Sequence, residues 1–243
     1  MNEITTCELI EECGQTSCIN CTKRPLSLLD DLQPEELNIL EQGKYSQIYK
    51  AGDILFQEGD EPKGLICLHT GKVKITKNGL FEAPLIVSLK RPVDFIGLDA
   101  LVLEKKHDTT ATVLEDSKVC VLKKSKFLKI LNSNVGLSLK VMRLLANQLR
   151  LADDRMLKLT QKHMRARMAD ALLLLYSEYG TLSDNNTLNV QLKRADLAAM
   201  ANMTPANAIR VLSLFVKEGL IETNKRQIKI NNIQSLRQIS QLG

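Results

Sequence analysis

The sequence lacks any apolar run long enough to cross a membrane. No stretch approaches the roughly 18 consecutive apolar residues that a membrane-spanning helix needs. The first residues, MNEITTCE, are polar and acidic, unlike a secretory signal. We therefore expect a cytoplasmic protein with no membrane partner. Stable disulfides are uncommon in that compartment, where clustered cysteines more often bind metal or sense redox state.

Signatures of catalysis are also missing. The sequence offers no Ser/His/Asp set, no phosphate-binding loop and no paired acids in a suitable context. Histidine is scarce, and His69, His107 and His163 are too scattered along the chain to suggest one metal site. The sequence therefore argues against an enzyme.

Positive charge is concentrated in the C-terminal half. Residues 1–132 hold 17 Lys and Arg against 20 Asp and Glu, a balance of −3, whereas residues 133–243 hold 16 against 8, a balance of +8. A basic half favours an anionic partner, and nucleic acid is the common case. A surface that is basic only for solubility is the alternative.

The sequence pattern changes along the chain from one typical of strands to one typical of helices. Between Ile48 and Leu122, short β-rich runs such as LICLHTGKVKIT alternate with glycine turns, which favours an antiparallel sandwich or barrel. A short helix with Pro34 in its first turn precedes them. From Ser125 the chain turns helical and stays so to Tyr179. The expected fold class is α+β.

An apolar seam runs through this helical region, with steps of 3, 4, 3, 4 and 3 residues between its members. These steps give the a/d pattern of a coiled coil, and no charged residue interrupts them. The pattern favours a dimer interface over a helix packed only on its own domain. The seam consists of Met142, Leu145, Leu149, Ala152, Met156 and Leu159.

The strongest signal is the segment ADLAAMANMTPANAIRVLSLFVKEGLI, which is typical of a helix, a turn and a second helix. The first helix is expected over 194–201. Thr204 is a good N-cap and Pro205 suits the first helical position, so the second helix is expected to run from there to about Glu218 and to end at Gly219. Its buried face is expected to comprise Ala208, Val211, Leu212 and Phe215.

The opposite face of the second helix suits base reading in a major groove. Asn207 can pair bidentately with adenine, Arg210 can pair with guanine, and Ile209 can touch a thymine methyl. The segment IETNKRQIKI predicts a hairpin whose basic tip would serve as a wing on the phosphate backbone. The expected DNA-contacting residues are Thr204, Ala206, Asn207, Ile209, Arg210, Ser213, Lys217, Lys225 and Arg226.

The order of these parts resembles the CRP/FNR family of bacterial transcription regulators from about Leu26 to the end of the chain. The likeness rests on KAGDILFQEGD, LHTGKVKI, VDFIGLDAL and the helix-turn-helix segment quoted above. It implies a homodimer that places two recognition helices in successive major grooves of a two-fold symmetric double-stranded DNA site. It also implies RNA polymerase as a partner.

The resemblance also implies a division of the chain. It gives a cysteine-rich segment at 1–25, a cyclic-nucleotide-binding-like β-roll as effector domain at 26–132, a dimerisation helix at 133–161 and a winged helix-turn-helix domain at 162–243.

The effector implied by the resemblance is not cyclic AMP. Family members that bind it carry Gly-Glu at the start of a short helix in the roll and, later, an Arg followed by Ser or Thr, which hold the cyclic phosphate. This chain has Gly97-Leu98-Asp99 at the first position and His107-Asp108 near the second. The Arg is missing, and Asp108 would repel a phosphate.

The sequence GLDA is instead similar to the FNR branch, which senses oxygen through an iron–sulfur cluster. That branch holds the cluster with an N-terminal Cys-x2-Cys-x5-Cys and one distant Cys. Cys18 and Cys21 match the first pair, and Cys120 matches the distant ligand. Ser27 stands where the third N-terminal cysteine would be.

A four-thiolate 4Fe–4S site therefore needs another cysteine. We expect Cys13 to complete the set, with Cys7 as a further candidate. Cys67, inside GLICLHTG, is expected to be a buried strand cysteine with no such role.

Three hypotheses for the cysteines stay open. The first is a cluster that responds to oxygen, redox state or nitric oxide. The second is zinc binding or thiol oxidation without a cluster. The third is a regulator controlled by another small molecule in the roll, with incidental thiols in a loose tail.

The recognition helix departs from the FNR branch, which usually presents Glu, Ser and Arg to the bases. The matching positions here are Ala206, Ile209 and Arg210. We expect a half-site that keeps a guanine contact and otherwise differs from that of the branch.

Overall fold

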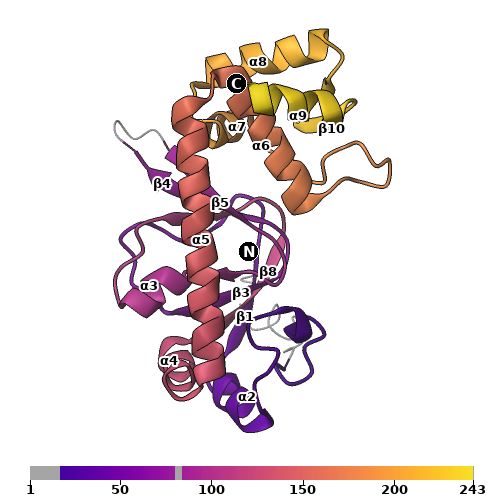
Figure 1. Cartoon of the computed structure of the whole chain (residues 1–243). Helices are drawn as coiled ribbons and strands as arrows, with labels where there is room; N and C mark the ends of the chain where they lie inside the picture. The colour runs from indigo at the N-terminus through magenta and orange to yellow at the C-terminus, as the bar shows by residue number, and fades with distance from the viewer. Residues whose placement is uncertain (1–16, 80–83, 243) are drawn as a thin grey trace, which may run out of the picture. The chain divides into compact units, whose positions relative to one another are not determined.

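The computed structural model describes residues 17–79 and 84–242. The chain divides into two compact units, whose helices and strands are labelled in Figure 1. The first unit takes in the chain up to Ile75 together with Lys90–Gln148, and the second takes in Thr76–Leu89 and the chain from Leu149.

In the described part of the N-terminal half, eight strands form two sheets with the orders β1-β8-β3-β6 and β2-β7-β4-β5. The β-rich region predicted between Ile48 and Leu122 is confirmed, as is the α+β class. The strands are β1 Tyr45–Tyr49, β2 Ile54–Phe56, β3 Gly64–Thr70, β4 Val73–Asn78, β5 Pro84–Lys90, β6 Phe95–Ile96, β7 Thr110–Val113 and β8 Ser117–Lys123.

The central pair of the first sheet, β3 and β8, approaches unusually closely at one end. A Cβ atom built at Gly64 would lie 2.2 Å from the carbonyl oxygen of Leu122, so only glycine fits there. This contact holds the antiparallel register, in which Cys67 faces Cys120.

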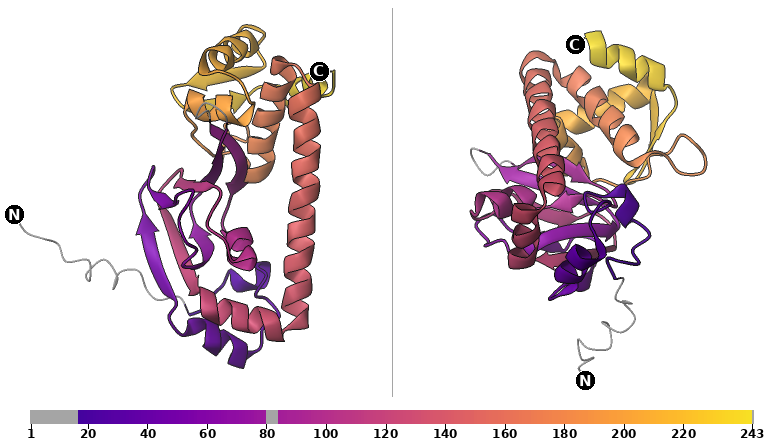
Figure 2. Two further views of the ribbon diagram at one scale, coloured as in Figure 1. Left: turned by 90° about the vertical axis from the view of Figure 1, so that its left-hand side faces the viewer. Right: turned by 60° about the horizontal axis from the view of Figure 1, so that its bottom comes forward.

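Short helices close one end of this sheet in the first unit. They are the 3₁₀ turn η1 (Arg24–Leu26), α2 (Pro34–Glu41), α3 (Leu98–Leu103) and α4 (Lys124–Ser133). Helices α2 and α4 pack on each other and on β8, as Figure 2 shows. Their buried side chains share one apolar core with strand residues and with the start of the next helix: Leu37, Leu40, Leu65, Leu122, Phe127, Ile130, Leu137 and Val141.

The long helix α5 (Val135–Gln161) follows α4 after a break at Asn134. At the break, Asn134 is extended, and its side-chain oxygen accepts a hydrogen bond from the Leu137 N–H at 2.9 Å. An Asn side chain in this position caps a new helix and so ends the old one. A second break at Lys162 and His163 separates α5 from α6 (Met164–Tyr179). The helical region expected from Ser125 to Tyr179 therefore consists of three helices.

The second unit contains α6 and the remaining C-terminal elements. These are α7 (Arg194–Met200), α8 (Pro205–Lys217), the hairpin of β9 (Ile221–Asn224) and β10 (Gln227–Ile230), and α9 (Ile233–Leu242). Helix α6 packs against α7, α8 and α9. Within residues 17–79 and 84–242, no helix combines the length and the apolar character needed to cross a membrane.

Candidate functional site

Two of the cysteines lie side by side on the first sheet. The register pairs Ser46 with Cys120, Cys120 with Cys67, and Cys67 with Phe95, which makes one row across all four strands. Partners directly opposite each other in adjacent strands point to the same face of a sheet. The Sγ of Cys120 lies 3.4 Å from the Oγ of Ser46. Cys67 and Cys120 therefore present their thiols to the same space.

The N-terminal segment brings two more cysteines to that space. Cys18, Cys21, Cys67 and Cys120 all line one pocket of the first unit. Cys18 is 8% exposed and belongs to the apolar core. Its backbone N–H and the hydroxyl of Ser17 both donate to the Glu41 carboxylate at the end of α2. This anchor sets where the segment meets the sheet.

Three basic residues also line the pocket: Lys23, Arg24 and Lys44. The ammonium of Lys44 lies 3.7 Å from the Cys18 Sγ and 3.4 Å from the Glu41 carboxylate, and that of Lys23 donates to the His69 carbonyl. The Nε of Arg24 is buried and has no hydrogen-bond partner among the described residues. The pocket thus combines thiols with positive charge that would offset the charge of thiolates.

Burial keeps two of these thiols protonated. It raises the pKa of Cys18 from 9.0 to about 11, against the opposing effect of the nearby Lys44. Burial also raises the pKa of Cys67 well above its usual value, and the thiols of Cys120, Cys18 and Cys21 raise it further. A thiol held protonated is a poor nucleophile. Coordination to a metal, by contrast, removes the proton outright.

The four thiols are not already arranged around a common metal position in the described part of the chain. Across residues 17–79 and 84–242, no three His, Cys, Asp or Glu side chains are arranged to hold an ion. Cys18 and Cys21 lie in a turn-rich segment without helix or strand, so they could draw toward Cys67 and Cys120 without breaking the sheet. The chemistry of the donor set, four thiols beside basic groups, fits an iron–sulfur cluster or zinc.

The structure thus brings together Cys18, Cys21 and Cys120 of the set predicted from sequence. Cys13 and Cys7 lie outside the described residues. The pocket adds Cys67, which is half-buried and which sequence reasoning assigned no role. The signal that could have found it is the strand alternation that puts Cys67 opposite Cys120, but that requires knowing the register of two strands far apart in the chain.

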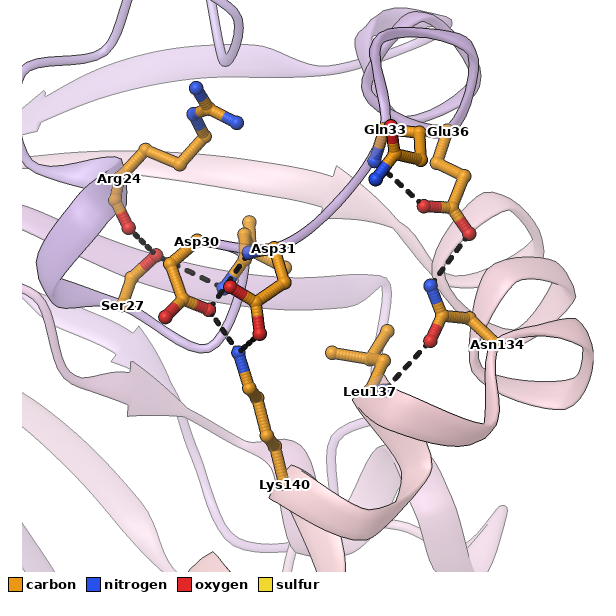
Figure 3. Close-up of polar contacts among 10 residues, drawn as sticks. Arg24, Ser27, Asp30, Asp31, Gln33, Glu36, Asn134, Leu137 and Lys140 are labelled. Atoms are coloured by element: carbon orange, nitrogen blue, oxygen red, sulfur yellow. Dashed lines mark hydrogen bonds and ion pairs between the residues drawn. The ribbon is translucent and has the colours of Figure 1, made fainter.

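The segment after the cysteines is tied to the start of α5 by polar contacts (Figure 3). The ammonium of Lys140 pairs with the carboxylates of both Asp30 and Asp31. The side-chain amide of Asn134 donates to Glu36 of α2 at 2.7 Å. These links and the shared core join the pocket to the long helix within the first unit.

Apolar side chains of α5 remain uncovered in the single chain. Only Leu137 and Val141 of this helix are buried. Met142, Leu149 and Met156 of the predicted seam are 55%, 64% and 59% exposed. Ala152 is exposed too, and Leu145 and Leu159 are partly buried. An apolar stripe of this kind is typical of a surface that another helix covers.

The predicted helix-turn-helix is present in the second unit. Thr204 caps α8 by accepting the Asn207 N–H at 3.3 Å, Pro205 is the first helical residue, and Gly219 follows the end with φ of 71°. Ala208, Val211, Leu212 and Phe215 are buried as expected. Asn202 adopts φ of 48° in the turn between α7 and α8.

The predicted contact residues of α8 share its open face. Asn207 is half-buried, and its side-chain oxygen accepts a hydrogen bond from Arg210 Nη2 at 3.1 Å. Lys225 and Arg226 form the exposed turn of the β9–β10 hairpin, whose backbone at Lys225 accepts from Arg194 at 3.1 Å. The exposed members of the set are Thr204, Ala206, Ile209, Arg210, Ser213, Lys217, Lys225 and Arg226.

Two arginines that the sequence did not single out hold the second unit together. Arg155 of α5 donates to the carbonyls of Val87 at 3.0 Å and Met200 at 3.1 Å. Arg165 of α6 pairs with Glu218 at 2.6 Å and stacks over Phe215, with 5.2 Å from its guanidinium carbon to the ring centroid.

The space beside the short helix α3 is filled by a histidine. The His107 ring is 6% exposed and stacks on Phe56, with centroids 3.6 Å apart. A Cβ at Gly97, the residue before α3, would lie 2.8 Å from the His107 ring. Burial lowers the pKa of His107, so its ring is neutral at pH 7.

Family models match two parts of the chain. A cyclic nucleotide-binding domain matches residues 46–134, and a Crp-like helix-turn-helix domain matches residues 166–239. Among curated proteins, the fumarate and nitrate reduction regulatory protein of Escherichia coli is 26% identical, with 92% of this chain and 90% of that protein covered. The cyclic AMP receptor protein of Thermus thermophilus is also 26% identical, with coverages of 88% and 96%.

Solved structures share the fold at lower identity. FixK2 from Bradyrhizobium japonicum has a TM-score of 0.72 at 23% identity, covering 81% of this chain and 96% of its own. A regulator described as of the crp/fnr family from Eubacterium rectale has a TM-score of 0.74 at 16% identity, with coverages of 88% and 97%.

The raised pKa of Cys18 predicts slow alkylation in the folded, metal-free chain. The shift from 9.0 to about 11 cuts the thiolate fraction at pH 8 roughly 100-fold. We expect the rate with iodoacetamide at Cys18, followed by peptide mass spectrometry, to rise steadily from pH 8 to beyond pH 10. The control is the same cysteine in the urea-unfolded chain, and a folded-state plateau near pH 9 would contradict the prediction.

Proposed function

Because the chain belongs to the CRP/FNR family of transcription regulators, we propose that it reports oxygen or redox state to DNA through a thiolate-held iron–sulfur cluster. Members of the family bind DNA as dimers and are regulators, not enzymes. The proposal rests on one observation: four cysteines and three basic residues line the same pocket of the first unit.

In this proposal Cys18, Cys21 and Cys120 hold the cluster, with a fourth thiolate treated below. A cluster, when bound, supplies an iron centre whose state oxygen or nitric oxide can change. Lys23, Arg24 and Lys44 offset the negative charge of the thiolates. The buried Nε of Arg24 offers a donor that no described residue uses. The cytoplasm is the compartment that keeps such thiols reduced.

Thiol oxidation alone is less well supported. Burial holds the thiols of Cys18 and Cys67 protonated, which opposes direct attack on an oxidant. A cyclic nucleotide also finds little support, because the neutral His107 ring packs beside Gly97 where cyclic AMP-binding relatives are expected to hold the phosphate. Asp108 adds a negative charge next to it.

In this proposal, a change at the pocket reaches the DNA-binding helices through α5, by way of the ion pairs and core contacts described above. Movement of Cys18 and Cys21 displaces the segment that carries Asp30 and Asp31, and these pair with Lys140 of α5. A ligand shifts a conformational equilibrium only by contacts that differ between the two states. We propose that these ion pairs, and the packing of the core around Leu137, differ between the two conformational states.

The DNA-binding form is proposed to be a homodimer. The seam of α5 would pair with its copy, and each α8 would enter a major groove of a two-fold symmetric site, with the β9–β10 hairpin on the phosphates. The regulator would then act together with RNA polymerase. The full set of contact and seam residues is the one named from the sequence.

The dimer proposal predicts that Leu149→Glu dissociates the protein. Pairing would bury an unpaired carboxylate from each chain, at a cost of several kcal/mol, which raises the dissociation constant roughly a hundredfold or more. Leu151→Glu is the matched control, because Leu151 is also exposed on α5 but lies off the seam. Light scattering coupled to gel filtration distinguishes the two, and equal masses for both variants would refute the seam.

The DNA proposal predicts that substitutions in the recognition helix α8 and in the β9–β10 hairpin weaken DNA binding in different ways. Arg210→Ala should cost about 1–3 kcal/mol of binding and relax the preference for one guanine, whereas Lys225→Ala should weaken all sequences alike and lower the salt slope by about one. Binding-site selection followed by anisotropy titrations at several salt concentrations measures both. Arg237→Ala, which removes an exposed charge from α9, is the control, and a half-site identical to that of the FNR branch would contradict the assignment.

The sensor proposal predicts roughly four iron atoms and matching sulfide per chain in protein purified without oxygen. Air should change both the visible spectrum and the affinity for DNA. Metal analysis separates a cluster from zinc. A colourless protein without iron or zinc would end the metal proposal, and unchanged DNA affinity after air would end the redox proposal.

A further inference from the structure

Position 27 cannot serve as a thiolate ligand, and its hydroxyl is already engaged. The Ser27 Oγ donates to the Arg24 carbonyl at 2.8 Å and accepts the Leu29 N–H at 3.2 Å (Figure 3). These bonds belong to the turn that follows η1. The residue that the family pattern would use as a ligand therefore has a local structural role here.

Cys67 lies where a replacement thiol would be needed. It faces Cys120 directly across the β3–β8 pair, and the Gly64–Leu122 contact holds that register. Opposed residues of an antiparallel pair have Cβ atoms roughly 5 Å apart on one face. A ligand bound by Cys120 is thus within the reach of its neighbour.

The other wall of the pocket carries Cys18 and Cys21, so the described residues supply four thiols from three segments of chain. Four cysteinyl thiolates are the usual requirement of a cluster.

We propose that Cys67 supplies the fourth thiolate, giving the set Cys18, Cys21, Cys67 and Cys120. This assignment rests on the proposed function and replaces Cys13, the expectation from sequence. It makes the sheet contribute two ligands and the N-terminal segment two. The cysteines upstream, Cys7 and Cys13, are then dispensable for metal binding.

The test compares iron and sulfide content, visible absorption and electron paramagnetic resonance of full-length variants reconstituted without oxygen. Cys67→Ala should lower bound iron roughly tenfold or more, and Cys120→Ala should do the same. The double variant Cys7→Ser, Cys13→Ser should keep the wild-type amount. Iron retained by Cys67→Ala and lost from the double variant would overturn the assignment while leaving the proposed function intact.

A rescue separates ligand loss from misfolding. Ser27 also lines the pocket, so Ser27→Cys added to Cys67→Ala places a thiol at the family position and should restore bound iron. Failure to restore it would mean that Cys67→Ala acts through the fold, and this counts against the assignment. A wild-type chain without iron or zinc overturns the proposed function itself.

Discussion

The pairing of β3 with β8 is the constraint on which the first unit depends. At Gly64 any side chain would clash with the Leu122 carbonyl of the opposite strand, so this pairing requires glycine there. A slip of one residue would turn every side chain of β3 to the other face. Cys67 would then leave the pocket, and Leu65, which lies two residues earlier on the same face, would leave the apolar core. The same register therefore specifies both the packing of the roll and the grouping of the thiols.

The pocket and the long helix share one apolar core, which gives coupling a physical basis. Cys18, Leu122 and Phe95 on the pocket side belong to the same cluster as Leu137 and Val141 of α5. Close-packed interiors do not deform continuously, so a displaced side chain is passed on to its neighbours. Nearer the surface, the ion pairs of Lys140 with Asp30 and Asp31 likewise link the N-terminal segment to α5.

Much of the fold could be predicted because its signals are local. Thr204, Pro205 and Gly219 bound α8 through their own backbone chemistry, and the 3.6-residue period sets its buried face. The hydrogen bond between Asn134 and Glu36 could not be predicted, because the two residues lie nearly a hundred positions apart in the chain. The placement of Cys67 opposite Cys120 could not be predicted for a related reason: β3 and β8 are joined only in the folded sheet. Arg155 likewise contacts two carbonyls that its own helix cannot indicate.

The hydrogen bond between Arg210 and Asn207 has a consequence for recognition. A free arginine on a helix surface samples many rotamers and loses that freedom on meeting a base. Here the guanidinium is partly ordered beforehand by the Asn207 side-chain oxygen. If α8 enters a major groove as proposed, the two residues act as one preorganised element. Asn207 then contributes to affinity through any base it contacts and by reducing the entropy that Arg210 loses on binding.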